Sequence, residues 1–130
     1  MNLVEKLLSV DKKLLTEEIT QEYESHNMKK LTGDGTITIR RIRDRKMNGI
    51  KTMCIGSDGQ YNGQIFDVKL MTLVEGIVYP SLKDENLINH FGVATPKELA
   101  ELLFNGETDE ITDAIEGVGK EENVEAIVKN

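Results

Sequence analysis

Few residues in this chain could carry out chemistry. Its two histidines, His26 and His90, and its one cysteine, Cys54, are far apart in the sequence. The Cys-x-x-Cys, His-Glu-x-x-His and calcium-loop spacings do not occur. A cysteine near apolar residues with no neighbouring histidine is typical of a small core residue. The sequence therefore predicts neither a nucleophilic centre nor a metal site.

Two further patterns have structural explanations. Gly33-Asp34-Gly35 lacks the third glycine of a dinucleotide loop and the Lys-Ser/Thr of a phosphate loop, so it indicates a turn. Asp109, Glu110 and Asp113 fall in the first turns of a predicted helix, where carboxylates interact favourably with the helix dipole. We therefore expect no cofactor and no enzymatic activity.

A basic run from Arg40 to Lys46 is the one segment that suggests phosphate binding. Its cationic residues are Arg40, Arg41, Arg43, Arg45 and Lys46. The run begins inside a predicted strand, whose side chains alternate between two faces, and no aromatic stacking platform flanks it. Nucleic-acid binding or regulation through these five residues is therefore kept as the alternative function.

Length and composition indicate one small intracellular domain. The 130 residues are 38% apolar and contain no tryptophan, so aliphatic side chains and methionine must form the core. One cysteine excludes an intrachain disulfide and fits a reducing cytosol. No apolar run approaches the roughly 20 residues of a membrane helix, and the N-terminus lacks the pattern of a signal peptide. We expect a single domain over residues 1–130, in the cytoplasm and without a membrane partner.

Charge is unevenly distributed along the chain, whose net charge is −7. Residues 29–51 contain eight Lys/Arg against two Asp, a balance of +6, whereas residues 98–130 contain ten acids against two Lys, a balance of −8. Either the two regions face each other or keep the surface hydrated, or each attracts a different partner.

Hydrophobic periodicity in the first 45 residues predicts a helix and a hairpin. Leucine and valine recur at helical spacing from Asn2 to Val10, with a further turn possible through Leu15. Thr36–Arg40 alternates strictly and is rich in β-branched residues, and a glycine-containing turn precedes it. We expect Glu22–Leu31 to pair with Thr36–Ile42 as a β-hairpin.

Residues 46–130 are predicted to be helical. A short helix is indicated between Ile42 and Cys54, and a nearly all-apolar central helix spans Phe66–Val78 and ends at Pro80. Further helices are expected at Leu82–His90, at Pro96–Phe104, after a cap at Thr108 up to Gly117 or Gly119, and at Val124–Val128. The fold class is thus α+β and mainly helical: an N-terminal helix and β-hairpin (1–45), then a compact bundle of four to five helices (46–130).

The clearest helix start is Thr95-Pro96-Lys97-Glu98. Thr95 can accept a hydrogen bond as the N-cap, Pro96 occupies the first helical position, and Glu98 completes a capping box. Asn105-Gly106 is predicted to end this helix because both residues tolerate positive φ.

Short sequence motifs on both sides of this helix start show a family resemblance in their order and spacing. They are Val68-Lys69-Leu70, Leu73 to Pro80, Leu82-Lys83-Asp84 with Leu87, His90 to Leu99, Leu102-Leu103, Gly106-Glu107, and Ile111 with Ile115. With the opening Leu7 to Lys12, they resemble the phage tail assembly chaperones of the XkdN-like type.

The resemblance implies a non-catalytic function in phage or prophage tail morphogenesis. Such chaperones hold the long, helical tape-measure protein soluble before the tail tube polymerises around it, and tail-tube subunits are a further client class. On this basis we expect a cytoplasmic protein that binds the tape-measure protein; self-association is left open. The predicted contact residues are Leu99, Leu102, Leu103, Phe104, Ile111 and Ile115, which could also form the chain's own core.

Overall fold

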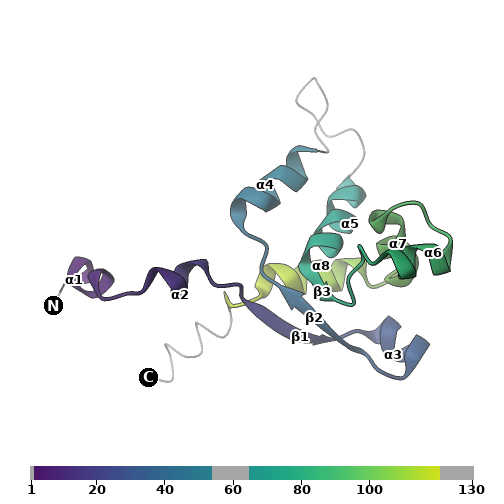
Figure 1. The fold of residues 1–130 in the computed structure, drawn as a ribbon, viewed down its shortest axis with the longest axis horizontal. Coiled ribbons are helices and arrows are strands. Elements are labelled where there is room, and N and C mark those ends of the chain that lie inside the picture. Colours follow the sequence, from purple (N-terminus) through teal and green to yellow (C-terminus); the bar gives the residue numbers. More distant parts are fainter. Residues whose placement is uncertain (1, 54–64, 121–130) are drawn as a thin grey trace.

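The computed structural model describes residues 2–53 and 65–120, which form eight helices and three strands (Figure 1). The elements are α1 Leu3–Leu8, α2 Lys12–Thr16, β1 Thr20–Glu24, α3 His26–Thr32, β2 Thr36–Arg40, α4 Asp44–Thr52, α5 Ile65–Gly76, β3 Ile77–Tyr79, α6 Glu85–Phe91, α7 Pro96–Leu103 and α8 Thr108–Gly117. This mainly helical α+β architecture confirms the predicted fold class.

The predicted pairing of two N-terminal strands is confirmed in part: the first strand is Thr20–Glu24 and not Glu22–Leu31, and the second is Thr36–Arg40. β1 and β2 are antiparallel, with Thr20 opposite Arg40 and Glu24 opposite Thr36. The alternation in β2 buries Ile37 and leaves Thr36 exposed, as a strand with one face on the core requires.

The connection between these strands differs from the prediction, because His26–Thr32 is the helix α3 and not part of a strand. Ser25 caps this helix by accepting a hydrogen bond from the Met28 N–H, and Gly33 ends it with φ +84°. The carboxylate of Glu107, far along the chain, accepts hydrogen bonds from Ser25 Oγ (2.8 Å) and from the backbone N–H groups of His26 (2.6 Å) and Asn27 (3.3 Å). Because this acceptor comes from a residue far along the chain, the local sequence pattern did not predict the helix α3.

The third strand was also missed, and the central helix is shorter than predicted. α5 ends at Gly76 instead of continuing to Val78, and residues 77–79 form β3, in which Ile77 pairs with Ile39. A Cβ added at Gly76 would lie 2.5 Å from Ile115 Cδ1, so only glycine allows this close approach of α5 to α8. The last turn of the predicted helix is thus a strand, β3, which pairs with β2.

The core lies between the sheet and the C-terminal helices. α5 packs against α4, α7 and α8, and Figure 1 shows it between α4 and the α6–α7 pair. The fully or nearly fully buried apolar side chains include Ile37, Ile39, Leu73, Leu82, Leu99, Phe104, Ile111, Ile115 and Val118.

Capping chemistry fixes the starts of the later helices. Thr95 Oγ1 accepts a hydrogen bond from the Glu98 N–H (3.1 Å), which confirms the predicted start of α7, and Gly106 follows the helix with φ +86°. α6 begins at Glu85 and not at Leu82, because Asp84 is its N-cap. In α8 the N-cap is Glu107 and not Thr108, which is the first helical residue.

The remaining helix predictions are either matched or fall outside the described residues. The helix between Ile42 and Cys54 is present as α4. Cys54 itself and the predicted helix Val124–Val128 lie outside the described residues.

Candidate interaction surface

The N-terminal arm, residues 2–16, carries its apolar side chains into solvent. α1 and α2 begin at the N-caps Asn2 and Asp11, whose side chains accept backbone hydrogen bonds, and neither helix contains a buried residue. Figure 1 shows both helices projecting away from the sheet and the helical region. Seven large apolar side chains of the arm are 40–81% exposed: Leu3, Val4, Leu7, Leu8, Val10, Leu14 and Leu15.

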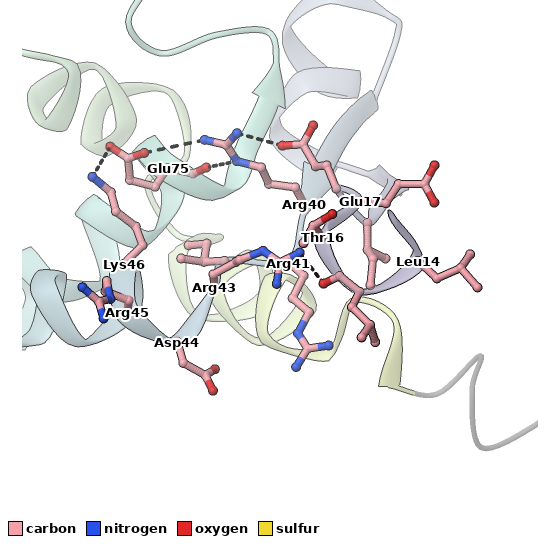
Figure 2. Close-up of a pocket in the computed structure, with 14 residues that line it drawn as sticks. Leu14, Thr16, Glu17, Arg40, Arg41, Arg43, Asp44, Arg45, Lys46 and Glu75 are labelled. Carbon is pink, nitrogen blue, oxygen red and sulfur yellow. Dashed lines mark hydrogen bonds and ion pairs between the residues drawn. The ribbon is translucent and has the colours of Figure 1, made fainter. Parts of the chain in front are cut away.

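A cleft separates the base of this arm from the predicted basic run. Its volume is about 770 Å³, and it opens broadly to solvent. Figure 2 shows Asp44, Arg45 and Lys46 on one side of it and Leu14 and Glu17 on the other, with Glu75 at one end. Its lining consists of Leu14, Leu15, Thr16, Glu17, Glu18, Ile19, Arg40, Arg41, Ile42, Arg43, Asp44, Arg45, Lys46 and Glu75, and we call it the arm cleft.

Two arginine side chains hold the base of the arm against the body. Arg43 Nη2 donates a hydrogen bond to the Leu15 carbonyl oxygen (2.9 Å), and Arg40 Nη1 contacts Glu18 Oε1 at 2.8 Å. Both side chains of the second pair are more than a third exposed, so the pair is a weak attachment in water. Polar contacts, not buried apolar ones, therefore join the arm to the cleft.

Glu75 is the electrostatic centre of the structure. Its side chain, at the end of α5, is 10% exposed and is approached by three cations from different parts of the chain. The Lys83 nitrogen lies 3.0 Å from it, Arg40 Nη2 3.6 Å and the Lys46 nitrogen 3.7 Å. The Glu75 backbone carbonyl also accepts a hydrogen bond from Arg40 Nε at 2.6 Å.

Opposing effects act on the Glu75 carboxyl group. Burial raises its pKa, but the hydrogen bond from Lys83 and the charges of Lys83, Lys46 and Arg40 lower it more, and the net pKa is below the ordinary value for glutamate. The carboxyl group is thus ionised at neutral pH. It links β2, α4 and the segment before α6 in a single charge cluster.

The predicted nucleic-acid residues are brought to one cleft but differ in their engagement. Arg40 and Lys46 are tied to Glu75, and Arg43 is tied to the arm. Arg41 and Arg45 are exposed, and neither takes part in an ion pair within the described residues. In residues 2–53 and 65–120 no ion pair joins the basic stretch 29–51 to the acidic stretch 98–120. The two charge blocks therefore do not neutralise each other through ion pairs there.

The predicted apolar contact residues lie mostly inside the molecule. Five of the six are at most 7% exposed: Leu99, Leu103, Phe104, Ile111 and Ile115. They fill the space between α5, α7 and α8, so in this conformation they form the chain's own core. Leu102 is the exception at 52% exposed, and it lines a shallow hollow with Phe66 and Val93. Contact between Leu102 and a partner stays a prediction.

Within the part of the chain that the structure describes, no group of three or more His, Cys, Asp or Glu side chains could hold a metal ion. No helix there is both long enough and apolar enough to cross a membrane.

A family model for the phage XkdN-like tail assembly chaperone protein matches residues 4–128, almost the full length of the chain. The chain belongs to this family of tail assembly chaperones. The match includes the N-terminal arm, the arm cleft and the helical region, so all three are parts of the chaperone unit.

One solved structure shares the fold of this tail assembly chaperone. The crystal structure of the protein YqbN aligns with a TM-score of 0.58 at 18% identity, over 76% of this chain and 87% of that one. At this identity the likeness concerns the fold. No curated protein matches the chain.

Sequence reasoning missed two features of this chaperone, one exposed and one buried. The exposure of the arm's leucines was not foreseen, because a helical apolar stripe looks the same whether or not the chain supplies something to cover it. The role of Glu75 was also missed: it stands within an apolar run, and only this setting signals that a buried acid there needs cationic partners.

Proposed function

We propose that this chaperone binds the tape-measure protein of its phage in the host cytoplasm and keeps it soluble until the tail tube forms around it, without catalysing a reaction. The observation that carries the proposal is the N-terminal arm, whose seven large apolar side chains are 40–81% exposed. Seven large apolar side chains left in solvent within one segment of fifteen residues are typical of an interaction site. Family membership supplies the class of client.

The structure of the arm suits reversible binding of a client helix. Its helices are short and contain no buried residue, so its shape does not depend on a rigid core. Apolar side chains at helical spacing can lie along the apolar stripe of a client helix, in the manner of helix-in-groove recognition. The apolar stripe of the client would then be covered, and copies of the client could not aggregate through it.

The test is co-expression of the chaperone with the tape-measure protein, with the soluble fraction of the client as the readout. In the arm variant Leu7→Gln/Leu8→Gln, two exposed apolar side chains become polar, at 56% and 81% exposure, without disturbing the core. We expect the soluble client to fall at least severalfold, while the variant's own thermal melting is unchanged.

Two matched controls locate the contact. Leu31→Gln, on α3, makes the same chemical change at a side chain that is 65% exposed and away from the arm, and should leave the client soluble. Leu102→Gln, on α7, tests the one exposed member of the sequence-predicted contact set. A client that stays equally soluble with the arm variant would contradict the proposal.

A further inference from the structure

The arm cleft places positive charge beside apolar side chains. Arg41 and Arg45 are exposed and are in no ion pair within the described residues, and Arg43 keeps its charge because its recorded partner is a backbone carbonyl. Leu14 and Leu15 also line the cleft and are 66% and 64% exposed. The lining of the cleft thus includes both apolar and cationic side chains.

Charge argues for an acidic occupant. The whole chain has a net charge of −7, so three arginines that form no ion pair within the described residues are a local exception, although acids also line the cleft. A segment with carboxylates beside these arginines gains attraction there, whereas a basic segment is repelled. A second copy of this chain would bring its own −7 to the contact, which opposes close association over the rest of the two surfaces.

The lining favours a peptide over nucleic acid. None of the fourteen lining residues is aromatic, so no ring is available for bases to stack on. Glu17 and Asp44 also line the cleft, and their carboxylates repel a continuous run of phosphates. A peptide can place its acids only where the arginines are. The exposed leucines have no function in binding a phosphate backbone.

We propose that the arm cleft selects client segments in which acidic residues flank an apolar stripe, with the stripe against Leu14 and Leu15 and the carboxylates at Arg41, Arg43 and Arg45. This inference rests on the proposed function and adds the chemical class of the client segment. The arginines supply discrimination between segments, and the leucines supply the apolar contact that any client stripe can use.

The test uses three synthetic amphipathic peptides with one leucine stripe and polar faces of Glu, Gln or Lys, titrated into the full chain and followed by fluorescence anisotropy. We expect the Glu peptide to bind about tenfold more tightly than the Gln peptide, and the Lys peptide most weakly. The differences should shrink as ionic strength rises, because the charges are exposed.

A charge variant and a matched control make the assignment specific. In Arg41→Gln/Arg45→Gln, two cleft charges are removed while Arg43, which holds the arm, is kept; the Glu peptide should then bind no better than the Gln peptide. Lys30→Gln/Lys51→Gln removes the same charge from exposed residues that do not line the cleft, and should preserve the preference.

Four results would overturn the inference. The first is equal binding of the Glu and Lys peptides, and the second is a preference for the Glu peptide that the cleft variant does not change. The third is a 24-base-pair duplex that binds more tightly than the Glu peptide and loses binding in the same variant, which would assign the cleft to nucleic acid. The fourth is a concentration-dependent dimer in sedimentation velocity that the variant abolishes, which would assign the cleft to a second copy.

The two proposals fail in distinguishable ways. If the tape-measure protein loses solubility with the arm variant, but the cleft variant changes the affinity of no peptide, the chaperone function stands and the charge selection is wrong. If the arm variant leaves the client soluble, the chaperone function through the arm is itself wrong, whatever the peptides do.

Discussion

At the scale of single residues, Glu75 shows how one buried charge can hold several elements. Its carboxylate is nearly buried, and each of the three cations around it remains largely hydrated, with side chains 36–59% exposed. Losing the carboxylate would leave Arg40, Lys46 and Lys83 close to one another, with Glu18 as the remaining ion-pair partner of Arg40. The cluster therefore stabilises the fold mainly through the acid and only weakly through any one base.

We expect Glu75→Gln to lower the free energy of unfolding by about 1–2 kcal/mol at pH 7. Because the pKa of Glu75 is lowered in the folded state, its stabilisation is complete above the ordinary glutamate pKa and is lost as pH falls through the folded value. The difference between wild type and variant should thus be constant near neutrality and shrink below about pH 4.

Urea denaturation at a series of pH values measures this difference. Glu18→Gln is the control, since Glu18 pairs with the same Arg40 but has a side chain that is 52% exposed; its effect should stay below about 1 kcal/mol. A Glu75→Gln difference that grew toward acid pH would show that the pKa is raised and that the cations do not dominate.

At the scale of elements, α3 depends on an acceptor from the other end of the chain. Glu107 is 3% exposed and binds the first N–H groups of α3, while Asn27 Nδ2 donates to the carbonyl oxygens of Leu103 and Asn105. A carboxylate at a helix N-terminus satisfies donors that the helix leaves free and is favoured by the helix dipole.

Glu107→Ala should therefore destabilise the protein by about 2–3 kcal/mol, since several donors lose a charged acceptor. Hydrogen exchange at the His26 and Asn27 amides of α3 should accelerate more than exchange in the neighbouring strands. The pKa of Tyr23, which is raised by burial and by the charges of Glu107 and Glu110, should fall toward its ordinary value. Glu101→Ala, at an exposed position of α7, should change stability by less than about 0.5 kcal/mol. Equal effects of the two substitutions would contradict the capping role.

Elements set by neighbouring residues were predictable from the sequence, and those set by distant residues were not. The capping box of α7 was predictable because Thr95 and Glu98 act within one turn: Thr95 accepts from the Glu98 N–H, and Glu98 accepts from the Ala94 N–H at 2.7 Å. By contrast, β3 exists because β2 offers a strand edge, and α3 exists because Glu107 reaches it. Neither partner is visible in the local pattern.

The same reasoning explains the mixed outcome for the candidate sites. Sequence spacing identified both the basic run and the apolar residues of α7 and α8, but it could not say which apolar stripe the fold would cover. The fold buries Leu99, Leu103 and Phe104 in the core cluster that includes residues of α5. The leucines of the arm stay exposed.

At the scale of the whole molecule, the arm and the body have separate energetic roles. The arm contains no buried residue, and the core described above lies entirely outside it. Arg43 attaches the arm through a polar contact to the Leu15 carbonyl oxygen, and the ion pair of Arg40 with Glu18 lies just beyond the arm. Stability of the body should thus be nearly independent of the arm.

We therefore expect deletion of residues 2–16 to change the free energy of unfolding of the remaining chain by less than about 0.5 kcal/mol, while binding of the client is lost. Chemical denaturation measures the first quantity, and co-precipitation with the tape-measure protein measures the second. The Leu31→Gln variant serves as the control for client binding. A loss of 2 kcal/mol or more would mean that the arm packs on the body in solution.

This separation has an evolutionary consequence. A substitution in the core changes the stability of the fold as well as any binding. A substitution among the arm's leucines changes binding alone, because these side chains are not part of the core. On the proposed function, the arm is thus the segment in which substitutions can adjust client binding without lowering the stability of the body.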